Sequence, residues 1–343
     1  MKNCFFLWTL LLALAVVSSC DEVWVGPESI NTPKTNFDLF WQAFDRHYAY
    51  FSIKEVDWDS VYQAYQPRIH PNMTDEELFA ILTEIGRLLQ DGHYYVVSND
   101  LTLSFSYFGA SPRNAIPTHP FPAISYLEEE KQINSFISYA RVRDTDVGYL
   151  RITSFEGELE DYQTIDAIID ALAGTRALIV DARTTRGGDT DLAKVIASRF
   201  ANQPHEYRRY KYRNGPNRDE FTDWITDVVV PEGEGHYPHP VVVLTDRRCF
   251  SACEGFVLMM QALPDVVTLG DTTFGGTARA VWQELPNGWS YRVSTWFVVQ
   301  PDGQVVEGRG IAPDISAPYV QVDSFDIQDN AMDRAIELLG EIG

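Results

Sequence analysis

The feature that most constrains the fold is a regular alternation of strand-like and helix-like segments between residues 147 and 271. VGYLRITSF (147–155) indicates a strand, DYQTIDAIIDAL (161–172) a helix, RALIVDAR (176–183) a buried strand and TDLAKVIASRF (190–200) another helix. HPVVVLTD (239–246), ACEGFVLMMQAL (252–263) and VVTLGD (266–271) continue the alternation. This order predicts an α/β protein with a largely parallel, helix-flanked sheet.

The segment before this sheet indicates a small helical domain over residues 35–93. Aromatic residues recur at helical spacing from Phe37 to Tyr48, which is typical of a helix-packing core. Thr74 with Glu77 three residues later predicts the start of a second helix, and Gly92 is a candidate C-cap before His93. Residues 94–146 indicate a connecting β-rich segment, residues 147–320 the main domain, and residues 321–343 a C-terminal helix. Within the main domain, the Asn-Gly pair at 287–288 predicts a hairpin.

The N-terminal residues predict an export signal. Lys2 precedes an apolar run over residues 5–17, which is too short for a membrane span but suits a signal-peptide core. The run ends in VVSSC and resembles a bacterial lipoprotein signal, which implies a signal peptide at 1–19, a lipidated Cys20 and a linker at 20–34. An ordinary secretory signal cleaved nearby remains the alternative. Either interpretation exports the protein from the cytoplasm. The lipoprotein interpretation implies a location in the cell envelope, periplasmic or at the cell surface, with the lipid as the only contact with a membrane.

Charge and composition limit the partners. The 343 residues carry a net charge of −22, which repels phosphate backbones and argues against nucleic acid. The insert HEYRRYKYRNGPNRDEF (205–221) concentrates basic residues and is expected as a solvated loop, with substrate contact as the alternative. Cys249 and Cys253 are separated by four positions at a strand-to-helix turn, where a disulfide is geometrically awkward. We expect two buried free thiols there, and neither a metal nor a cofactor.

A serine between those cysteines poses the functional question. Ser251 stands at the start of an apolar helix, where it could be an N-cap or a nucleophile. A catalytic serine needs a base, an orienting acid and N–H groups aimed at the oxyanion. Gly187 and Gly188, just before a helix, could supply such N–H groups, and His93 is the histidine that a rigid element would hold.

Five ordered motifs resemble those of the C-terminal processing and tricorn-type serine peptidases. They are GYLRITSF, ALIVDARTTRGGD, VVVLTDRRCFSACEGF, VVTLGDTTFGG and PDGQVVEGRGIAPDI. The helical stretches FWQAFDRHYAYFSIKEVDWDSVY and LLQDGHYYV look like the N-terminal region of the tricorn-like branch. The resemblance implies a ClpP/crotonase-like core of ββα units.

The resemblance also implies a set of catalytic residues. It places the nucleophile at Ser251, the base at His93 and an orienting carboxylate at Glu307. The N–H of Ala252 would join Gly187 or Gly188 as oxyanion donors. The processing branch uses a lysine base in a TFGKG segment, but this chain has TFGGT with Gly276 at that position.

Two further departures affect the site. Thr185 replaces an amide side chain of the family's turn, and Gly92 replaces the serine that precedes the histidine in tricorn. The resemblance also raises the question of a PDZ domain, which many processing peptidases carry between the helical region and the core. The interval from residue 96 to 146 is too short for a complete one.

The sequence therefore predicts an exported serine peptidase that acts on peptides or unfolded proteins. The alternative is a catalytically inactive relative that binds peptides or other ligands at the cell surface, favoured if a disulfide distorts the turn around Ser251. If His93 is the base, hydrolysis should fall as the pH drops through the imidazole pKa, ordinarily ~6.5.

Overall fold

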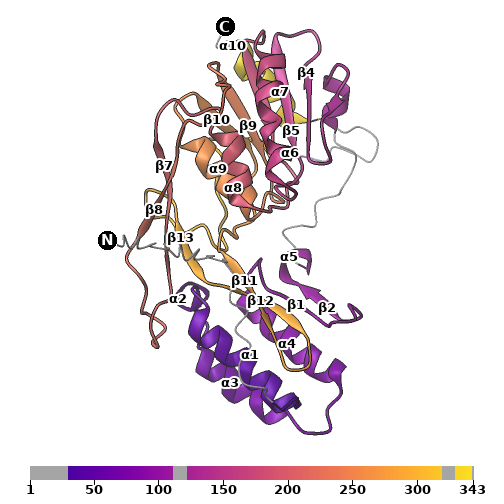
Figure 1. Cartoon of the computed structure of the whole chain (residues 1–343), viewed down its shortest axis with the longest axis vertical. Helices are drawn as coiled ribbons and strands as arrows, with labels where there is room; N and C mark the ends of the chain where they lie inside the picture. The colour runs from indigo at the N-terminus through magenta and orange to yellow at the C-terminus, as the bar shows by residue number, and fades with distance from the viewer. Residues whose placement is uncertain (1–29, 111–121, 319–328, 342–343) are drawn as a thin grey trace, which may run out of the picture.

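The computed structural model describes residues 30–110, 122–318 and 329–341, so the signal peptide and Cys20 lie outside the described residues. The chain forms an upper α/β unit and a lower helical unit joined at a narrow waist (Figure 1). Among the described residues, none of the helices combines the length and apolar character needed to cross a bilayer.

The upper unit is built on a seven-stranded sheet in the order β14-β10-β9-β6-β5-β4-β3. The strands from β14 to β5 run parallel, whereas β4 and β3 form an antiparallel edge. The bounds are β3 (Lys131–Gln132), β4 (Ile137–Arg141), β5 (Val147–Ile152), β6 (Ala177–Asp181), β9 (Val241–Thr245), β10 (Val266–Gly270) and β14 (Ile315–Ser316). The predicted largely parallel sheet is confirmed.

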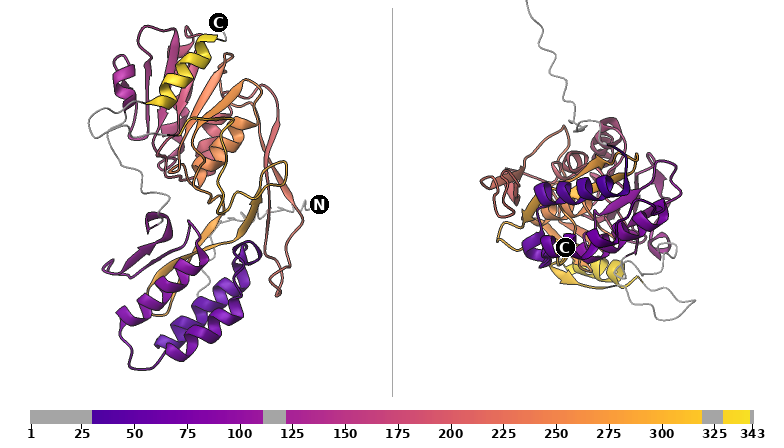
Figure 2. Two further views of the ribbon diagram at one scale, coloured as in Figure 1. Left: turned by 180° about the vertical axis from the view of Figure 1, so that it is seen from behind. Right: turned by 90° about the horizontal axis from the view of Figure 1, so that it is seen from below.

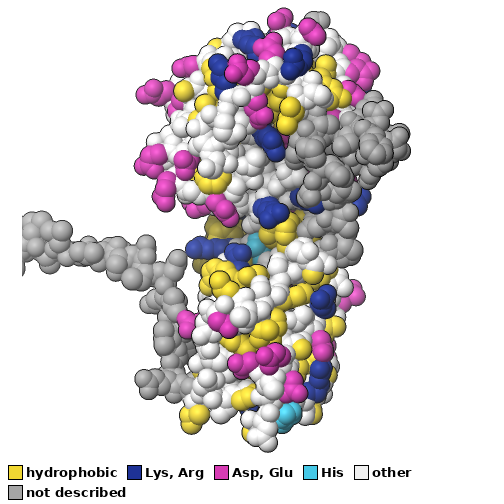
Figure 3. All heavy atoms as spheres, turned by 90° about the vertical axis from the view of Figure 1, so that its right-hand side faces the viewer, with side chains coloured by type: hydrophobic (Ala, Val, Ile, Leu, Met, Phe, Trp, Pro, Cys, Tyr) yellow, Lys and Arg dark blue, Asp and Glu magenta, His cyan; other side chains and the backbone are white. Residues whose placement is uncertain are grey.

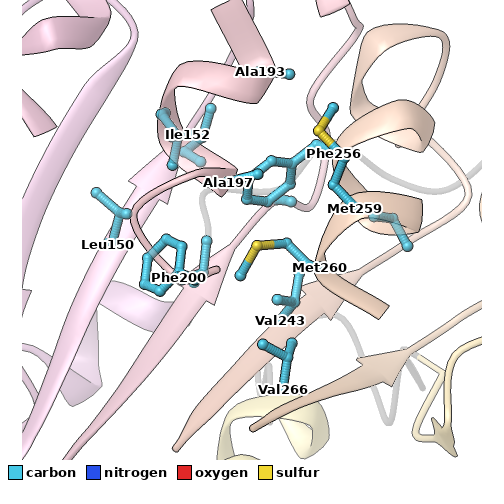
Figure 4. Close-up of a cluster of buried hydrophobic side chains, with 14 of the residues drawn as sticks. Leu150, Ile152, Ala193, Ala197, Phe200, Val243, Phe256, Met259, Met260 and Val266 are labelled. Carbon is cyan, nitrogen blue, oxygen red and sulfur yellow. The ribbon is translucent and has the colours of Figure 1, made fainter. Parts of the chain in front are cut away.

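Helices cover both faces of this sheet. Every residue of β6 and β9 is buried, which explains their continuous apolar sequences. One face packs against α6 (Leu159–Gln163), α7 (Ile165–Leu172), α8 (Thr190–Ala197) and α9 (Ala252–Gln261). Figure 4 shows Leu150 and Val243 of the strands in the same cluster as Phe256 and Met260 of α9. On the other face lies α10 (Asn330–Glu341), coloured yellow in Figure 2, within the span where a C-terminal helix was expected.

The lower unit contains the predicted helices. They are α1 (Pro33–His47), α2 (Phe51–Lys54), α3 (Trp58–Tyr65) and α4 (Asp75–Leu89). The Thr74–Glu77 capping box at the start of α4 is confirmed. The helices pack on a four-stranded sheet in the order β11-β12-β1-β2. The short helix α5 follows β2 along the chain. The bounds are β1 (Tyr95–Val97), β2 (Ser104–Ser106), α5 (Tyr107–Ala110), β11 (Ala280–Glu284) and β12 (Ser290–Ser294).

The β11–β12 hairpin comes from the segment expected to belong to the main domain, yet it lies in the lower unit. Its predicted Asn287-Gly288 turn is confirmed, and Gly288 has a φ of 82°. Val96 of β1 pairs with Tyr291 of β12, and Tyr291 is buried in the core of the lower helices. The core of the lower unit therefore contains residues of β1 and residues of β12 that lie almost 200 positions later in the sequence.

A three-stranded sheet links the two units on one side. It has the order β13-β7-β8, with bounds β7 (His205–Tyr212), β8 (Ile225–Val229) and β13 (Trp296–Val299). The expectation of a solvated loop at 205–221 is wrong over residues 205–212, because the alternating aromatic and basic side chains of β7 stack on rings of its neighbours. Tyr210 and Trp296, for example, stack with their ring centroids 3.9 Å apart.

Candidate active site

Ser251 lies on a tight turn between β9 and α9. Its φ is 60° and its ψ is −118°, which is a backbone conformation that non-glycine residues rarely adopt. The turn is held by the Asp246 carboxylate, whose Oδ1 accepts from the N–H groups of Thr184 (3.0 Å), Arg248 (2.9 Å) and Cys249 (3.1 Å). A strained residue at a strand-to-helix turn exposes its side chain at the carboxyl end of the sheet.

His93 reaches this turn from the lower unit. The chain leaves α4 through Gln90 in the left-handed conformation, and the Asp91 carboxylate accepts from the backbone N–H of His93 at 2.7 Å. Nε2 of His93 lies 2.9 Å from Oγ of Ser251, although 158 positions separate the two residues. The structure therefore brings the candidate nucleophile and the candidate base together.

Burial changes the titration of His93. Its ring is 3% exposed and packs against the ring of Phe250 with a centroid separation of 4.5 Å. Burial lowers the pKa of His93 to about 4, with Arg292 acting in the same direction and Asp91 in the opposite one. Nδ1 of His93 is buried and has no hydrogen-bond partner among the described residues. A neutral imidazole with a free Nε2 lone pair can accept the serine proton.

Glu307 is buried near the waist, where Lys54 is its partner. The ion pair between Lys54 Nζ and Glu307 Oε1 measures 2.7 Å, and the same Nζ donates to the carbonyl of Gln90 at 2.8 Å. Burial raises the pKa of Glu307 to about 8, while Lys54 opposes the rise. Within the described part of the chain, no hydrogen bond joins Glu307 directly to His93.

The glycine turn lies against the nucleophile. Gly187 has a φ of 96°, and a Cβ placed on it would lie 2.8 Å from Cβ of Ser251 and 3.2 Å from the backbone nitrogen of Ala252. A Cβ on Gly188 would instead collide with the backbone of Phe155. Both positions require glycine, and Gly187 is the one beside Ser251.

Thr185 ties the glycine turn to the nucleophile turn. Its hydroxyl donates to the carbonyl of Ile152 at 2.6 Å, and its own carbonyl accepts from the N–H of Phe250 at 3.2 Å. The residue that replaces the family's amide side chain therefore serves a structural role here.

Sequence reasoning missed a buried carboxylate in the turn, that of Glu254. It accepts from the hydroxyl of Thr273 (2.6 Å) and from the N–H groups of Gly275 (2.7 Å), Gly276 (2.7 Å) and Ser251 (3.2 Å). The Ser-x-x-Glu spacing of a capping box could have revealed it. Burial raises the pKa of Glu254, whereas these hydrogen bonds lower it. Lys54 was also missed, because its contacts with Glu307 and Gln90 join distant segments. Asp91 was missed although it lies only two residues before His93.

The two glycines identified from the sequence as departures, Gly276 and Gly92, have aromatic neighbours. A Cβ at Gly276 would collide with the ring of Phe250, and a Cβ at Gly92 would lie 2.6 Å from Phe274 and 2.7 Å from Phe250. Phe250 therefore occupies space that a lysine at 276 or a serine at 92 would need.

The expectation of free thiols is wrong. Cys249 and Cys253 form a disulfide with a Cα–Cα distance of 5.3 Å, because the turn between β9 and α9 brings Cys249 next to Cys253 in the first turn of α9. Both cysteines are fully buried. The disulfide coexists with the contact between His93 and Ser251.

Sequence comparison identifies two signatures. That of peptidase family S41 matches residues 146–317, and that of the tricorn protease C1 domain matches residues 31–86. The carboxy-terminal processing protease CtpA of Bacillus subtilis is 26% identical over 195 residues, which cover 54% of this chain and 40% of that protein. The match thus spans about two fifths of that relative's length.

Structural comparison extends the likeness to nearly the whole chain. A candidate peptidase from Parabacteroides merdae is 30% identical with a TM-score of 0.79, and the match covers 90% of this chain and 97% of that one. The tricorn protease has the same fold, with a TM-score of 0.58 and 13% identity over 91% of this chain and 37% of that one.

Proposed function

The chain belongs to peptidase family S41, and from this premise we propose that it hydrolyses peptide bonds with Ser251 as nucleophile and His93 as general base. The observation that carries the proposal is the 2.9 Å contact between Nε2 of His93 and Oγ of Ser251. Two polar groups from distant segments meet on a strained turn, which a purely structural serine does not require.

In the proposed first step, Oγ of Ser251 attacks the scissile carbonyl carbon while Nε2 of His93 takes the hydroxyl proton. The new C–O bond leaves negative charge on the former carbonyl oxygen. The N–H of Ala252, at the start of α9, and that of Gly187 or Gly188 would stabilise this oxyanion. His93 then returns the proton to the leaving amine as the C–N bond breaks, and water releases the acyl group by the same steps in reverse order.

Glu307 would orient His93 indirectly. Its ion pair fixes Lys54, and Lys54 holds the carbonyl of Gln90, three residues before His93. The carboxylate of Asp91 then fixes the backbone N–H of His93 itself. This chain of contacts supports a role in which Glu307 positions the base without taking its proton.

The absence of a lysine base fits a histidine mechanism. Gly276 stands where the processing branch carries its lysine, and Phe250 fills the space beside it. Export and lipidation of Cys20 remain part of the proposal, supported by the VVSSC motif, and the substrate would be a peptide or an unfolded protein.

One observation favours a second candidate, a catalytically inactive peptide-binding relative. The disulfide on either side of Ser251 restrains the turn that a nucleophile must present. Against it, the contact of Ser251 with His93 is within hydrogen-bond range.

Covalent labelling with a fluorophosphonate probe separates the two candidates. The wild-type protein should be labelled at Ser251 and should cleave a quenched casein substrate, because the probe reacts with activated serines. Ser251→Ala should lose both signals, and His93→Ala should lose nearly as much, whereas the exposed control Ser60→Ala should lose neither. A wild-type protein that stays unlabelled and inactive would refute the peptidase proposal.

A further inference from the structure

A row of three side chains crosses the four-stranded sheet of the lower unit close to His93. Trp282 of β11 pairs in register with Arg292 of β12, and the Arg292 guanidinium lies 5.3 Å from the ring centroid of Trp282. Tyr95 of β1 meets the same Trp282 ring edge-on at 5.7 Å. Because side chains alternate along a strand, Arg292 points away from the core that buries its neighbours Tyr291 and Val293.

The charge of Arg292 is not neutralised within the site. Three of the buried arginines, Arg183, Arg199 and Arg208, each form an ion pair with an aspartate. The buried Arg213 has no ion pair among the described residues, but it donates to the carbonyl of Tyr48 at 3.3 Å. Arg292 forms no ion pair and no hydrogen bond with any residue that the structure describes, and its Nε is buried. Burial lowers the pKa of Arg292, and among the described residues the carboxylate of Asp91 opposes this effect.

The row is adjacent to the reacting groups. Arg292 is close enough to lower the pKa of His93, and β1 begins two residues after His93. Trp282 is 52% exposed, so this face of the sheet is open. Figure 3 shows basic, histidine and hydrophobic side chains gathered at the waist between the two units. Arg292 therefore lies within electrostatic range of His93, on an open face of the lower unit.

We propose that Arg292 binds a carboxylate of the peptide substrate, with Trp282 and Tyr95 contacting the apolar part of the same residue. This inference rests on the proposed peptidase function and adds a substrate class: peptides with an acidic side chain, or the chain-end carboxylate, near the scissile bond. A guanidinium donates in a fixed fork that matches a carboxylate, and its stacking on an indole ring holds that fork in place.

A structural role makes a different prediction. If Arg292 only balances the charge of Asp91, its removal would change the affinity for all peptides by the same factor. If Arg292 binds substrate, its removal would weaken only those that present a carboxylate.

The test measures binding in a Ser251→Ala background, so that it does not depend on turnover. The probes are dansylated unstructured decapeptides in which a single Glu is scanned along the chain, each with a Gln twin, and each with a free or an amidated C-terminus. We expect at least one Glu position, or the free C-terminus, to bind about tenfold more tightly than its neutral twin. The Glu/Gln and acid/amide comparisons identify which carboxylate is recognised.

Variants of Arg292 decide the assignment. Arg292→Met should abolish the preference without weakening the neutral twins, and Arg292→Lys should retain part of it. Arg209→Met is the matched control, because Arg209 also lies over a tryptophan ring but on β7 of a different sheet. The inference is overturned if charged and neutral twins bind equally, if the preference survives Arg292→Met, or if Arg292→Met weakens every peptide alike. If the protein with Ser251 intact fails to cleave casein, the peptidase function is refuted, and these binding results are unaffected.

Discussion

The acid limit of the reaction depends on the burial of His93. A general base must be neutral to accept the serine proton, so the rate should fall as pH drops through the pKa of this histidine. Because burial lowers that pKa to about 4, the limb should lie about 2.5 pH units below the ordinary histidine value of ~6.5.

The difference is large at pH 5. With a pKa of about 4, roughly nine tenths of His93 is neutral at pH 5, whereas an ordinary pKa of ~6.5 would leave about 3% neutral. The two cases thus differ by about thirtyfold in kcat/KM. The assay is the initial rate on an unstructured fluorogenic peptide between pH 3.5 and pH 8, with each sample returned to pH 7 to separate titration from irreversible unfolding.

The same shift has a consequence for stability. The folded state holds His93 neutral, whereas the unfolded chain binds a proton near pH ~6.5, so stability is full above that pH and falls as pH drops toward about 4. A shift of this size corresponds to about 3 kcal/mol in the free energy of unfolding. Urea unfolding should show this loss in the wild type and a smaller one in His93→Gln, which cannot titrate.

The reasoning would be refuted if kcat/KM fell on the acid side with a midpoint near pH ~6.5, because that is the pKa of an ordinary exposed histidine and not of a buried one. It would also fail if His93→Ala retained the wild-type rate while Ser251→Ala was inactive, because another group would then be the base.

Three further predictions concern the surroundings of the site. Lys54→Met should lower the free energy of unfolding, and the loss should grow as the pH rises through about 8, because Lys54 opposes the rise in the pKa of Glu307 and favours its ionised form; adding Glu307→Gln should remove this pH dependence in urea unfolding, and additive effects would contradict the coupling. Gly276→Lys should destabilise the protein by about 1–3 kcal/mol through collision with Phe250 and should not restore activity to the base-deficient variant; a rescued rate on the fluorogenic peptide would show that the lysine mechanism is accessible. Replacing both cysteines of the disulfide by alanine should lower the free energy of unfolding by about 2 kcal/mol, and an unchanged melting temperature would show that this cross-link does not restrain the turn.

Much of the fold was predictable from the sequence because its signals are local. The apolar runs of β6 and β9 and the capping box at Thr74 depend on neighbouring residues, so their patterns survive without knowledge of the tertiary structure. The placement of the β11–β12 hairpin in the lower unit could not be predicted in this way. It depends on pairing between Val96 and Tyr291, which are distant in sequence, and no periodicity records such a contact.

For the site, the candidate residues could be named before the fold was known. The motif around Ser251, the glycine pair and the missing lysine at Gly276 could all be identified from their order along the chain. Only the tertiary structure decided how they meet. Folding brings His93 to Ser251 and Lys54 to Glu307, although both pairs are far apart in sequence. It also buries Nε of Arg292 without a hydrogen-bond partner among the described residues. Burial of His93 and Glu307 then sets their pKa values, because desolvation depends on the surrounding packing and not on the residue's neighbours in sequence.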